Sequence, residues 1–378
     1  MPGTSWLPLD RRPPATVLPD FPWDKLLVAK QQAAAHPDGI VDLSVGTPVD
    51  PVCTPVRSAL ASAADAPGYP SVLGRGELRR AYINWLQRAH GVTGLEEHAV
   101  LPTIGSKELV ASLPRQLGVR SGDSVVIPVL AYPTYEVGVL DAGATVVRSD
   151  MPWSSGIDRP AMVWINSPGN PSGIIWSVED LSQLVAWARE RGTVVVSDEC
   201  YLDLGWDAQP ISILHPEVSG GDHTGLLAVH SLSKRSNLAG YRAGFVSGDR
   251  GLVDGLLALR KHLGLMMPTP IQVAATAALQ NDAHVLAQSS RYRDRRTKLW
   301  DAFSDNGFSI GDDHTSAGGL YLWATEHREA ADTVSRLTER GILVAPGSFY
   351  GPSGARHVRI ALTATDERVD AAVQRLAR

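Results

Sequence analysis

Residues 194–201 read Val194-Val195-Val196-Ser197-Asp198-Glu199-Cys200-Tyr201, a short apolar run followed at once by polar side chains. A near-continuous apolar run of this length is typical of a strand that is covered on both faces of a sheet. Similar runs recur through the middle of the chain, at 125–127, 146–147, 162–165 and 226–229. The sequence therefore predicts a central sheet of buried strands.

Amphipathic segments separate these strands. The clearest begins at Ser177, a favourable helix N-cap with Asp180 three residues later, and ends at Gly192. Its apolar side chains recur at helical spacing on one face. The alternation of strand and helix predicts an α/β fold with a mostly parallel central sheet and right-handed crossovers.

The chain changes character after Gly264. A helical tract is expected from Pro270 to about Phe303, and strand-like segments follow at 319–323 and 357–362 with a helix between them. This order of elements predicts a second, smaller α+β domain.

These patterns divide the chain into three segments. We expect an N-terminal arm and part of the small domain in residues 1–44, a large domain in residues 45–263, and the small C-terminal domain in residues 264–378. The first 24 residues are rich in proline, which precludes an early helix, so an extended arm is expected there. The prolines concerned are Pro2, Pro8, Pro13, Pro14, Pro19 and Pro22.

The composition excludes several classes of function. The 378 residues are 44% hydrophobic and carry a formal net charge of −5, so no basic face for nucleic acid or an anionic membrane is expected. No apolar run approaches the ~20 residues of a membrane helix, and no secretory signal is recognised. Two distant cysteines, Cys53 and Cys200, fit a reducing cytoplasm. The scattered histidines predict no metal site, and no G-x-G-x-x-G follows a strand to bind a nicotinamide.

Ligands of doubly covered parallel sheets bind outside the carboxyl ends of the strands, so the residues there are the candidates for a site. A carboxylate such as Asp198 can hold a pyridinium nitrogen protonated, although aspartate after a strand is also a common turn former. Tyr201 could reach the phenolic oxygen of the same ring. Asn170 could donate to that oxygen, although its segment, 166–173, also suits a tight turn.

Two further segments suit a flat, phosphorylated ligand. Tyr132 follows the strand at 125–127, and its ring could stack on a heterocycle with a gain of roughly 0.5–1.5 kcal/mol beyond burial. Residues 103–108 open a helix, and the free amides at a helix N-terminus suit a phosphate. The same residues would also serve an ordinary helix start that binds no ligand.

The segment Ser231-Leu232-Ser233-Lys234 follows another strand, and Arg242 lies eight residues beyond the lysine. A lysine whose pKa is lowered by its site can form a Schiff base with an aldehyde, and the serines and the arginine can hold a phosphate dianion. The motif by itself is short and occurs by chance. Arg359 lies within an apolar strand, where its charge needs a carboxylate, either internal or a substrate's.

In their order and spacing, these motifs resemble those of the class I/II aminotransferases, pyridoxal-phosphate enzymes of fold type I. The similarity extends from about Asp42 to Leu362. It implies a large domain with a mostly parallel sheet, a smaller α+β domain, and pyridoxal 5′-phosphate as cofactor.

The resemblance also implies roles for individual residues. Lys234 would form the internal aldimine and then act as acid and base. Asp198 would pair with the ring nitrogen, Tyr201 and Asn170 would hydrogen-bond the 3-oxygen, and Tyr132 would stack on the ring.

The remaining implied roles concern the phosphate, the substrate and a second subunit. The α-carboxylate of the substrate would be received by Gly46 and Arg359. Tyr69 resembles the tyrosine that reaches the phosphate of the neighbouring subunit's cofactor, which implies a homodimer. The phosphate would be bound by Ser231, Ser233, Arg242 and the amides of Ser106 and Lys107.

Within this family, several segments look most like actinobacterial N-succinyldiaminopimelate aminotransferases of lysine and cell-wall biosynthesis. This likeness implies N-succinyl-LL-2,6-diaminopimelate as the amino donor, and glutamate with 2-oxoglutarate as the usual pair. Lys107, Arg75 and Arg235 are candidates for the further carboxylates of such a substrate, although a solvated surface charge is the simpler interpretation of each. The segments concerned are 21–24, 105–108, 231–242 and 345–351.

Other interpretations remain open at the level of sequence. An aminotransferase for another amino acid, or a pyridoxal-phosphate-dependent C–S lyase, would share this scaffold. A regulator built on an aminotransferase-like domain would need a basic DNA-binding module, and the short N-terminal arm argues against one.

Overall fold

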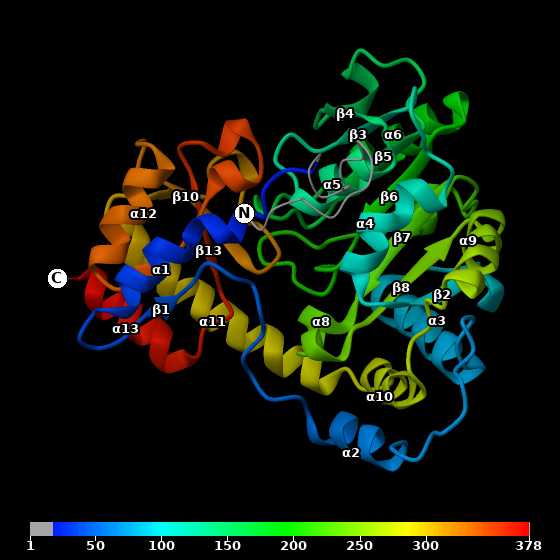
Figure 1. Cartoon of the computed structure of the whole chain (residues 1–378), viewed down its shortest axis with the longest axis horizontal. Coiled ribbons are helices and arrows are strands. Elements are labelled where there is room, and N and C mark those ends of the chain that lie inside the picture. The colour runs from blue at the N-terminus through cyan, green and yellow to red at the C-terminus, as the bar shows by residue number, and fades with distance from the viewer. Residues whose placement is uncertain (1–17, 378) are drawn as a thin grey trace, which may run out of the picture.

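A seven-stranded sheet forms the centre of the larger of two lobes in this computed structural model, which describes residues 18–377 (Figure 1). The strands lie in the order β2-β8-β7-β6-β5-β3-β4. Strands β3 to β7 are mutually parallel, and β8 is antiparallel to both of its neighbours. The bounds are β2 Val100–Ile104, β3 Ser124–Ile127, β4 Thr145–Arg148, β5 Met162–Asn166, β6 Val194–Asp198, β7 Leu226–Ser231 and β8 Ala243–Gly248.

The predicted mostly parallel sheet is confirmed, and each of the five apolar runs is a strand of it. Strands β2 and β8 were not predicted from the sequence. Strand β2 contains Pro102, which an edge strand tolerates because one side of its backbone pairs with no other strand in residues 18–377. Strand β8 contains Gly244 and Gly248, which weaken the apolar pattern. A Cβ on Gly244 would lie 2.9 Å from the carbonyl carbon of Gly105, so the close approach of the two segments requires this glycine.

Helices cover both faces of the large sheet (Figure 1). Successive residues of a strand point to opposite faces, and accordingly Val126 and Val195 belong to one buried cluster while Val125 and Val196 belong to the other. Helices α3, α6 and α10 pack on the first face, and α4, α5 and α9 on the second. The bounds are α2 Thr54–Ser62, α3 Gly76–His90, α4 Ser106–Gln116, α5 Pro133–Asp141, α6 Val178–Arg191, α7 Pro216–Ser219, α8 Leu232–Arg235, α9 Arg250–Leu263 and α10 Thr269–Leu279.

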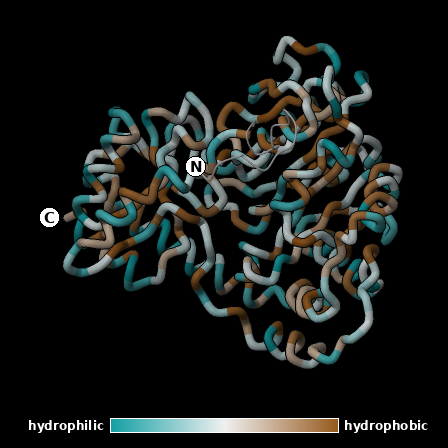
Figure 2. Tube along the Cα trace, viewed as in Figure 1, coloured by the Kyte–Doolittle hydropathy of each residue, from teal (hydrophilic) through white to brown (hydrophobic). Residues whose placement is uncertain are grey.

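The smaller lobe contains a four-stranded sheet in the order β12-β13-β10-β9 and has its own apolar core. Figure 2 shows apolar segments inside both lobes and polar residues along the outer helices. The predicted α+β character of this region is confirmed. The bounds are β9 Ser309–Ile310, β10 Tyr321–Thr325, β11 Ile342–Leu343, β12 Ala345–Pro346, β13 Val358–Ala361, α11 Ala283–Asp305, α12 Ala330–Glu339 and α13 Asp366–Leu376.

The N-terminal segment joins the smaller lobe, because β1 (Val41–Asp42) pairs in parallel with β11 and α1 (Leu27–Ala34) packs beside α12. The expected extended arm lies partly outside the described residues, at 1–17. Residues 18–21 form no helix, but a 3-10 helix, η2, spans Pro22–Leu26, so the expectation is wrong from Pro22 onward. Proline fits the first position of a helix, where no amide donor is needed.

One predicted helical tract is divided. Helices α10 and α11 take the place of a single helix from Pro270, with Gln280-Asn281-Asp282 between them. Helix α10 packs against α2 and α3, in the core of the large lobe, whereas α11 belongs to the small lobe. The domain boundaries at 44 and 263 stay predictions.

The structure also bears on membrane-spanning helices and on metal sites. In residues 18–377, no helix combines the length and apolar character needed to cross a bilayer. Nor do the described residues bring together three or more side chains suited to holding a metal ion.

Candidate active site

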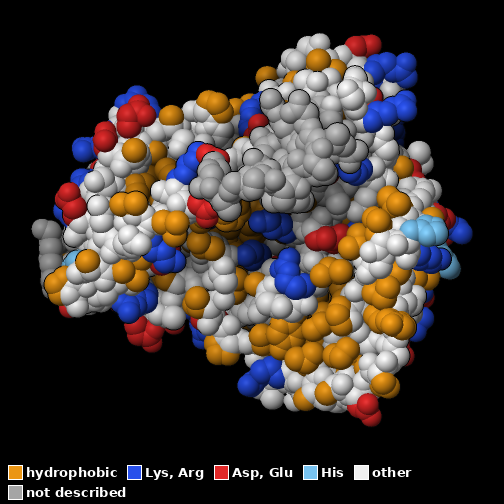
Figure 3. Space-filling model, in the orientation of Figure 1, with side chains coloured by type: hydrophobic (Ala, Val, Ile, Leu, Met, Phe, Trp, Pro, Cys, Tyr) orange, Lys and Arg blue, Asp and Glu red, His pale blue; other side chains and the backbone are white. Residues whose placement is uncertain are grey.

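A cavity of about 820 Å³ opens at the carboxyl ends of the parallel strands. Figure 3 shows Lys and Arg side chains gathered in the depression between the two lobes. Tyr69 does not line the cavity and is 99% exposed. All the other predicted site residues line it: Gly46, Ser106, Lys107, Tyr132, Asn170, Asp198, Tyr201, Ser231, Ser233, Lys234, Arg242 and Arg359.

Asp198, the last residue of β6, supplies a buried carboxylate to the cavity. Tyr135 Oη donates a hydrogen bond of 2.7 Å to Asp198 Oδ2, and the Cys200 amide donates one of 3.2 Å to Oδ1. Burial raises the pKa of Asp198, although these hydrogen bonds oppose the rise. No cation lies within ion-pair distance of this carboxylate among the described residues, so a cationic ligand group would relieve the cost of its burial.

Strands β5 and β6 end at the same level because Asn166 pairs with Asp198 in the parallel ladder. Asn166 Nδ2 donates to the backbone oxygen of Asp198 at 2.8 Å. Asn166 Oδ1 accepts from the amide of Asn170 at 2.7 Å, which shapes the turn after β5. Beside them, Tyr132 lines the cavity and contacts Tyr135 edge-on, with ring centroids 5.7 Å apart.

Lys234 lies on the short helix α8, directly after β7, and its ammonium group contacts the backbone oxygen of Gly46. Burial lowers the pKa of Lys234, and the cations of Arg359 and Arg242 also lower it. A lysine with a depressed pKa holds more of the neutral amine that attacks a carbonyl. The nucleophile predicted from sequence therefore lies in a suitable environment.

The N-terminus of α4 and the start of α8 meet at one corner of the cavity. Ser231 Oγ and Ser233 Oγ are 2.9 Å apart, and Arg242 lines the same cavity. Gly105, the N-cap of α4, has a φ of 70°, and a Cβ there would lie 2.3 Å from Arg242 Nη2. Glycine thus lets the guanidinium approach the free amides of the helix start.

Arg359 is 2% exposed, and among the described residues no carboxylate lies within ion-pair distance of it. Its Nη1 donates to Asn170 Oδ1 at 2.9 Å and its Nη2 to the Ser44 oxygen at 2.6 Å. The bond to Oδ1 leaves the Asn170 amide hydrogens free for another acceptor. Arg359 Nε is buried and has no hydrogen-bond partner in the part of the chain that the structure describes. A buried guanidinium with no carboxylate beside it favours the binding of a ligand that carries one.

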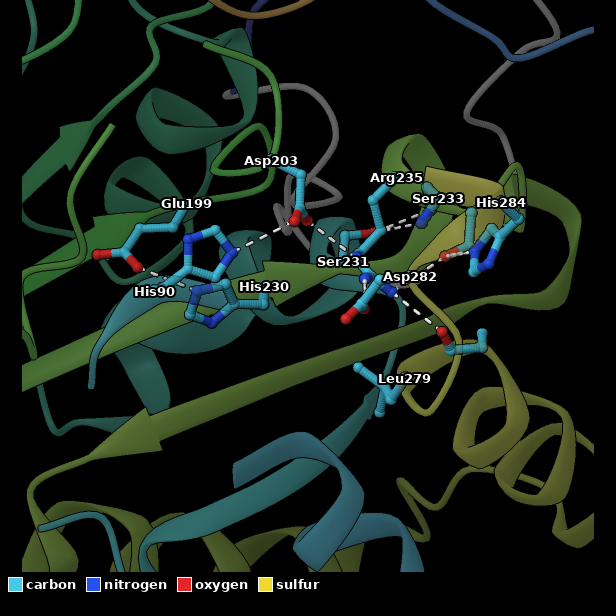
Figure 4. A network of polar contacts seen from close by, with 12 residues as sticks. His90, Glu199, Asp203, His230, Ser231, Ser233, Arg235, Leu279, Asp282 and His284 are labelled. Atoms are coloured by element: carbon cyan, nitrogen blue, oxygen red, sulfur yellow. Dashed lines mark hydrogen bonds and ion pairs between the residues drawn. The ribbon is translucent and has the colours of Figure 1, made fainter. Parts of the chain in front are cut away.

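A network of polar contacts anchors the turn that carries Lys234 (Figure 4). Arg235 Nε donates to Asp203 Oδ2 at 2.9 Å, and Arg235 Nη2 lies 3.6 Å from Asp282 Oδ1, at the start of α11. Burial alone raises the pKa of Asp203, but Arg235 and His90 hold it far below its usual value. The buried ion pair therefore joins α8 to the loop after β6 and to the base of α11.

A second contact in Figure 4 joins the ends of β6 and β7. His230 Nε2 lies 3.0 Å from Glu199 Oε2, and both side chains are buried. Tyr82 Oη lies 2.7 Å from His230 Nδ1. Because Glu199 follows Asp198 and His230 precedes Ser231, this contact fixes the spacing between the candidate ring-binding and phosphate-binding residues.

The three cations that could bind a distal carboxylate of the substrate differ in their position and in their ion-pair partners. Arg75 is paired with Glu77 on the surface, at 2.7 Å, and does not line the cavity. Arg235 is buried and forms an ion pair with Asp203, so it neither contacts the substrate nor lies on the surface as a solvated charge. Lys107 lines the cavity, and its Nζ lies 5.1 Å from the centre of the Phe21 ring.

Several polar residues that line the cavity were not predicted from the sequence, among them Tyr135, Asn166 and Tyr321. Tyr135 lies three residues after Tyr132, and Asn166 directly follows an apolar run, so their positions after strands were available signals. Tyr321 lies in an alternating strand of the small lobe, where nothing local points to a ligand.

These residues fit pyridoxal 5′-phosphate. The buried carboxylate of Asp198 suits a protonated ring nitrogen, the corner at Gly105 and Arg242 suits the phosphate, and Lys234 suits the aldehyde. The orphaned nitrogen of Arg359 leaves a place for a substrate carboxylate beside them.

Comparison with known proteins gives a consistent result. The family model “Aminotransferase class I and II” matches residues 38–376. “Probable aminotransferase Rv1178” of Mycobacterium tuberculosis is 58% identical over 359 residues, 95% of this chain and 85% of that protein. “4-dedimethylamino-4-oxo-anhydrotetracycline transaminase OxyQ” of Streptomyces rimosus is 53% identical over 95% of this chain and 99% of that protein.

The fold has close counterparts among solved structures. The structure of N-succinyldiaminopimelate aminotransferase from Mycobacterium tuberculosis matches with a TM-score of 0.86 and 25% identity, over 97% of this chain and 99% of that one. The chain belongs to the class I and II aminotransferases, fold type I enzymes that use pyridoxal 5′-phosphate.

Proposed function

We propose that this aminotransferase moves an amino group between N-succinyl-LL-2,6-diaminopimelate and 2-oxoglutarate, in the formation of diaminopimelate and lysine. The observation that carries the proposal is the placement of Lys107, a cation of the cavity wall with no ion-pair partner among the described residues. A substrate with carboxylates at both ends needs such a cation in addition to Arg359.

The site residues then have the following roles. When bound, pyridoxal phosphate supplies an aldehyde for the amino group and a ring that withdraws electrons from the Cα–H bond. Asp198 keeps its charge beside the ring nitrogen and so holds that nitrogen protonated. Tyr201 and the free amide of Asn170 donate to the 3-oxygen, and Tyr132 lies against the ring.

Arg359 and the backbone at Gly46 bind and orient the α-carboxylate of the amino donor. Lys234 Nζ removes the proton from Cα, because a neutral amine next to the reacting carbon can act as a base. Ser231, Ser233, Arg242 and the amides of Ser106 and Lys107 hold the phosphate, which fixes the position of the ring during these proton movements.

We further propose that the working unit is a homodimer. Tyr69 is almost fully exposed and flanked by Gly68 and Pro70, away from its own cavity. An aromatic residue so exposed suits a contact with another chain. In the proposed dimer the Tyr69 hydroxyl completes the phosphate site of the partner subunit.

Half-reactions with a panel of amino donors test the substrate. We expect glutamate and N-succinyl-diaminopimelate to bleach the visible band of the cofactor-loaded protein, and aromatic or branched donors to leave it. Lys107→Gln should weaken the succinylated donor about tenfold more than it weakens alanine. Equal rates with all donors would contradict the substrate assignment. Release of ammonia and pyruvate without 2-oxoglutarate would instead indicate a C–S lyase.

A second candidate is an aminotransferase for a bulky ring-containing oxo substrate. The observation in its favour is a second cavity of about 620 Å³ that shares Phe21, Trp23, Lys107 and Tyr132 with the first. Aromatic walls of this kind suit a flat ring system. The 53% identical relative is named for such a substrate, an oxo-anhydrotetracycline. Turnover of a tricyclic or tetracyclic ketone with glutamate, and none of N-succinyl-diaminopimelate, would favour this candidate.

A further inference from the structure

Tyr321 contacts two of the proposed site residues at once. The guanidinium carbon of Arg359 lies 3.8 Å from the centre of the Tyr321 ring. The Tyr321 hydroxyl lies 3.2 Å from the Tyr201 hydroxyl. Both tyrosines are buried and line the cavity.

The sheet of the small lobe builds the contact with Arg359. In the antiparallel pairing of β10 with β13, Trp323 lies opposite Arg359 and Tyr321 lies opposite Ala361. Tyr321 is therefore a diagonal neighbour of Arg359 on the same face, within reach of a long side chain. The planar guanidinium can lie flat on the ring, which fixes its orientation.

The contact with Tyr201 depends on a glycine. A Cβ on Gly46 would lie 2.1 Å from the Tyr321 hydroxyl oxygen. Any other residue at position 46 would displace this hydroxyl, so Gly46 and Tyr321 are matched. The same glycine offers its backbone oxygen to Lys234.

The charges around the two hydroxyls favour ionisation of Tyr321 over ionisation of Tyr201. Burial alone raises the pKa of Tyr321, but the cations of Arg359 and Lys234 outweigh it and lower that pKa. Burial and the neighbouring Tyr321 raise the pKa of Tyr201. Once ionised, the Tyr321 oxygen can only accept, and Tyr201 is then the donor of this hydrogen bond.

We propose that Tyr321 is a positioning residue with two separable actions. Its ring holds Arg359 flat for the α-carboxylate of the substrate, and its hydroxyl competes with the 3-oxygen of bound pyridoxal phosphate for the proton of Tyr201. The proposal rests on the site assignment made above.

Tyr321→Phe removes the hydroxyl and keeps the ring. Tyr201 then donates to the 3-oxygen alone, which stabilises the anionic form of that oxygen. The visible absorbance of the holoenzyme should titrate at a pH lower by at least about 0.3 units. The KM for glutamate should stay within about threefold of wild type, because the ring still supports Arg359. A smaller shift, or a shift to higher pH, overturns the proposed action of the hydroxyl.

Tyr321→Leu removes the ring as well. Arg359 then loses its flat support, so the KM for both glutamate and 2-oxoglutarate should rise about tenfold or more above that of Tyr321→Phe. Succinate, an unreactive dicarboxylate, should raise the melting temperature of the wild-type and Tyr321→Phe holoenzymes but not of Tyr321→Leu. Equal KM values and equal succinate effects in the two variants overturn the proposed action of the ring.

Tyr292→Phe is a matched control. Tyr292 is also buried, its hydroxyl lies 3.4 Å from Asn237, and Arg295 lies over its ring, but it is outside the cavity. The Tyr292→Phe variant should leave the pH midpoint of the absorbance titration and the KM for glutamate unchanged. A shift of the midpoint equal to that of Tyr321→Phe overturns the proposal. If the wild-type protein gains no visible band with pyridoxal phosphate, the site assignment fails instead.

Discussion

Burial shifts the ionisation of two cavity side chains, and in both it favours the neutral form. It lowers the pKa of Lys234 toward the neutral amine and raises that of Asp198, which has no cationic partner among the described residues. At the scale of the residue, the same desolvation therefore prepares a nucleophile at Lys234 and leaves at Asp198 a carboxyl group whose charge needs a cationic partner such as a protonated ring nitrogen. Both shifts can be tested with single substitutions.

Lys234→Ala should abolish transamination, with a loss of about 10⁴-fold or more, because the base for the Cα proton is removed. The visible band that wild-type protein shows with pyridoxal phosphate should also be lost. Lys234→Arg is the matched control, since it keeps a cation without a reactive amine and should be equally inactive. Full transamination by either variant would refute the assignment of Lys234.

Asp198→Asn should stabilise the protein in the absence of cofactor at neutral and higher pH. The folded-state pKa of Asp198 is raised, so the folded protein binds more protons than the unfolded chain between the unfolded and folded pKa values. Stability is therefore lost as pH rises through this window, and the amide side chain of the variant removes the loss. The melting temperatures of the wild-type protein and of Asp198→Asn should differ at pH 8 and should be equal below about pH 4. With cofactor bound, the Asp198→Asn variant should have strongly lowered activity.

At the scale of the element, capping residues in the sequence determine where some helices begin and end, whereas tertiary contacts determine other elements. Helix α6 begins and ends where its sequence predicts: Ser177 Oγ accepts from the amide of Asp180 at 3.0 Å, and Gly192 ends the helix with a φ of 65°. Strand β8 has no such signal. It exists because β2 and β7 pair with its two edges.

Ser177→Ala should lower the free energy of unfolding by about 1 kcal/mol, because the Asp180 amide loses its acceptor. The expected fall in melting temperature is about 1–2 °C for a chain of this size. Ser177→Asp should restore most of the stability, since aspartate is also a good N-cap. An unchanged melting temperature in Ser177→Ala would show that the cap contributes nothing.

At the scale of the whole molecule, the cavity requires segments that are far apart in the sequence. Gly46, Asp198, Lys234 and Arg359 meet in one cavity, although Gly46 and Arg359 lie in segments that pack with the small lobe. The proposed dimer adds Tyr69 from a second chain.

Mixing two inactive variants tests the dimer. If Tyr69 acts on the partner's site, a hybrid of Lys234→Ala and Tyr69→Ala chains contains one intact site and one doubly altered site. Random reassembly of equal amounts should then give about a quarter of wild-type activity. Activity no greater than the average of the two parents would place Tyr69 outside the partner's site. Sedimentation of the wild-type protein should show a mass of twice 40.5 kDa.

The sequence by itself determined the strand–helix alternation and the residues after the strands, because period and turn chemistry are local properties. Asp198, Asn170 and Lys234 could be predicted for this reason. The tertiary structure decided the contacts that join distant segments: the orphaned Arg359, the buried Arg235–Asp203 pair and the place of Tyr321. Such contacts depend on how the lobes pack and on which charges lose water, and no short stretch of sequence contains that information.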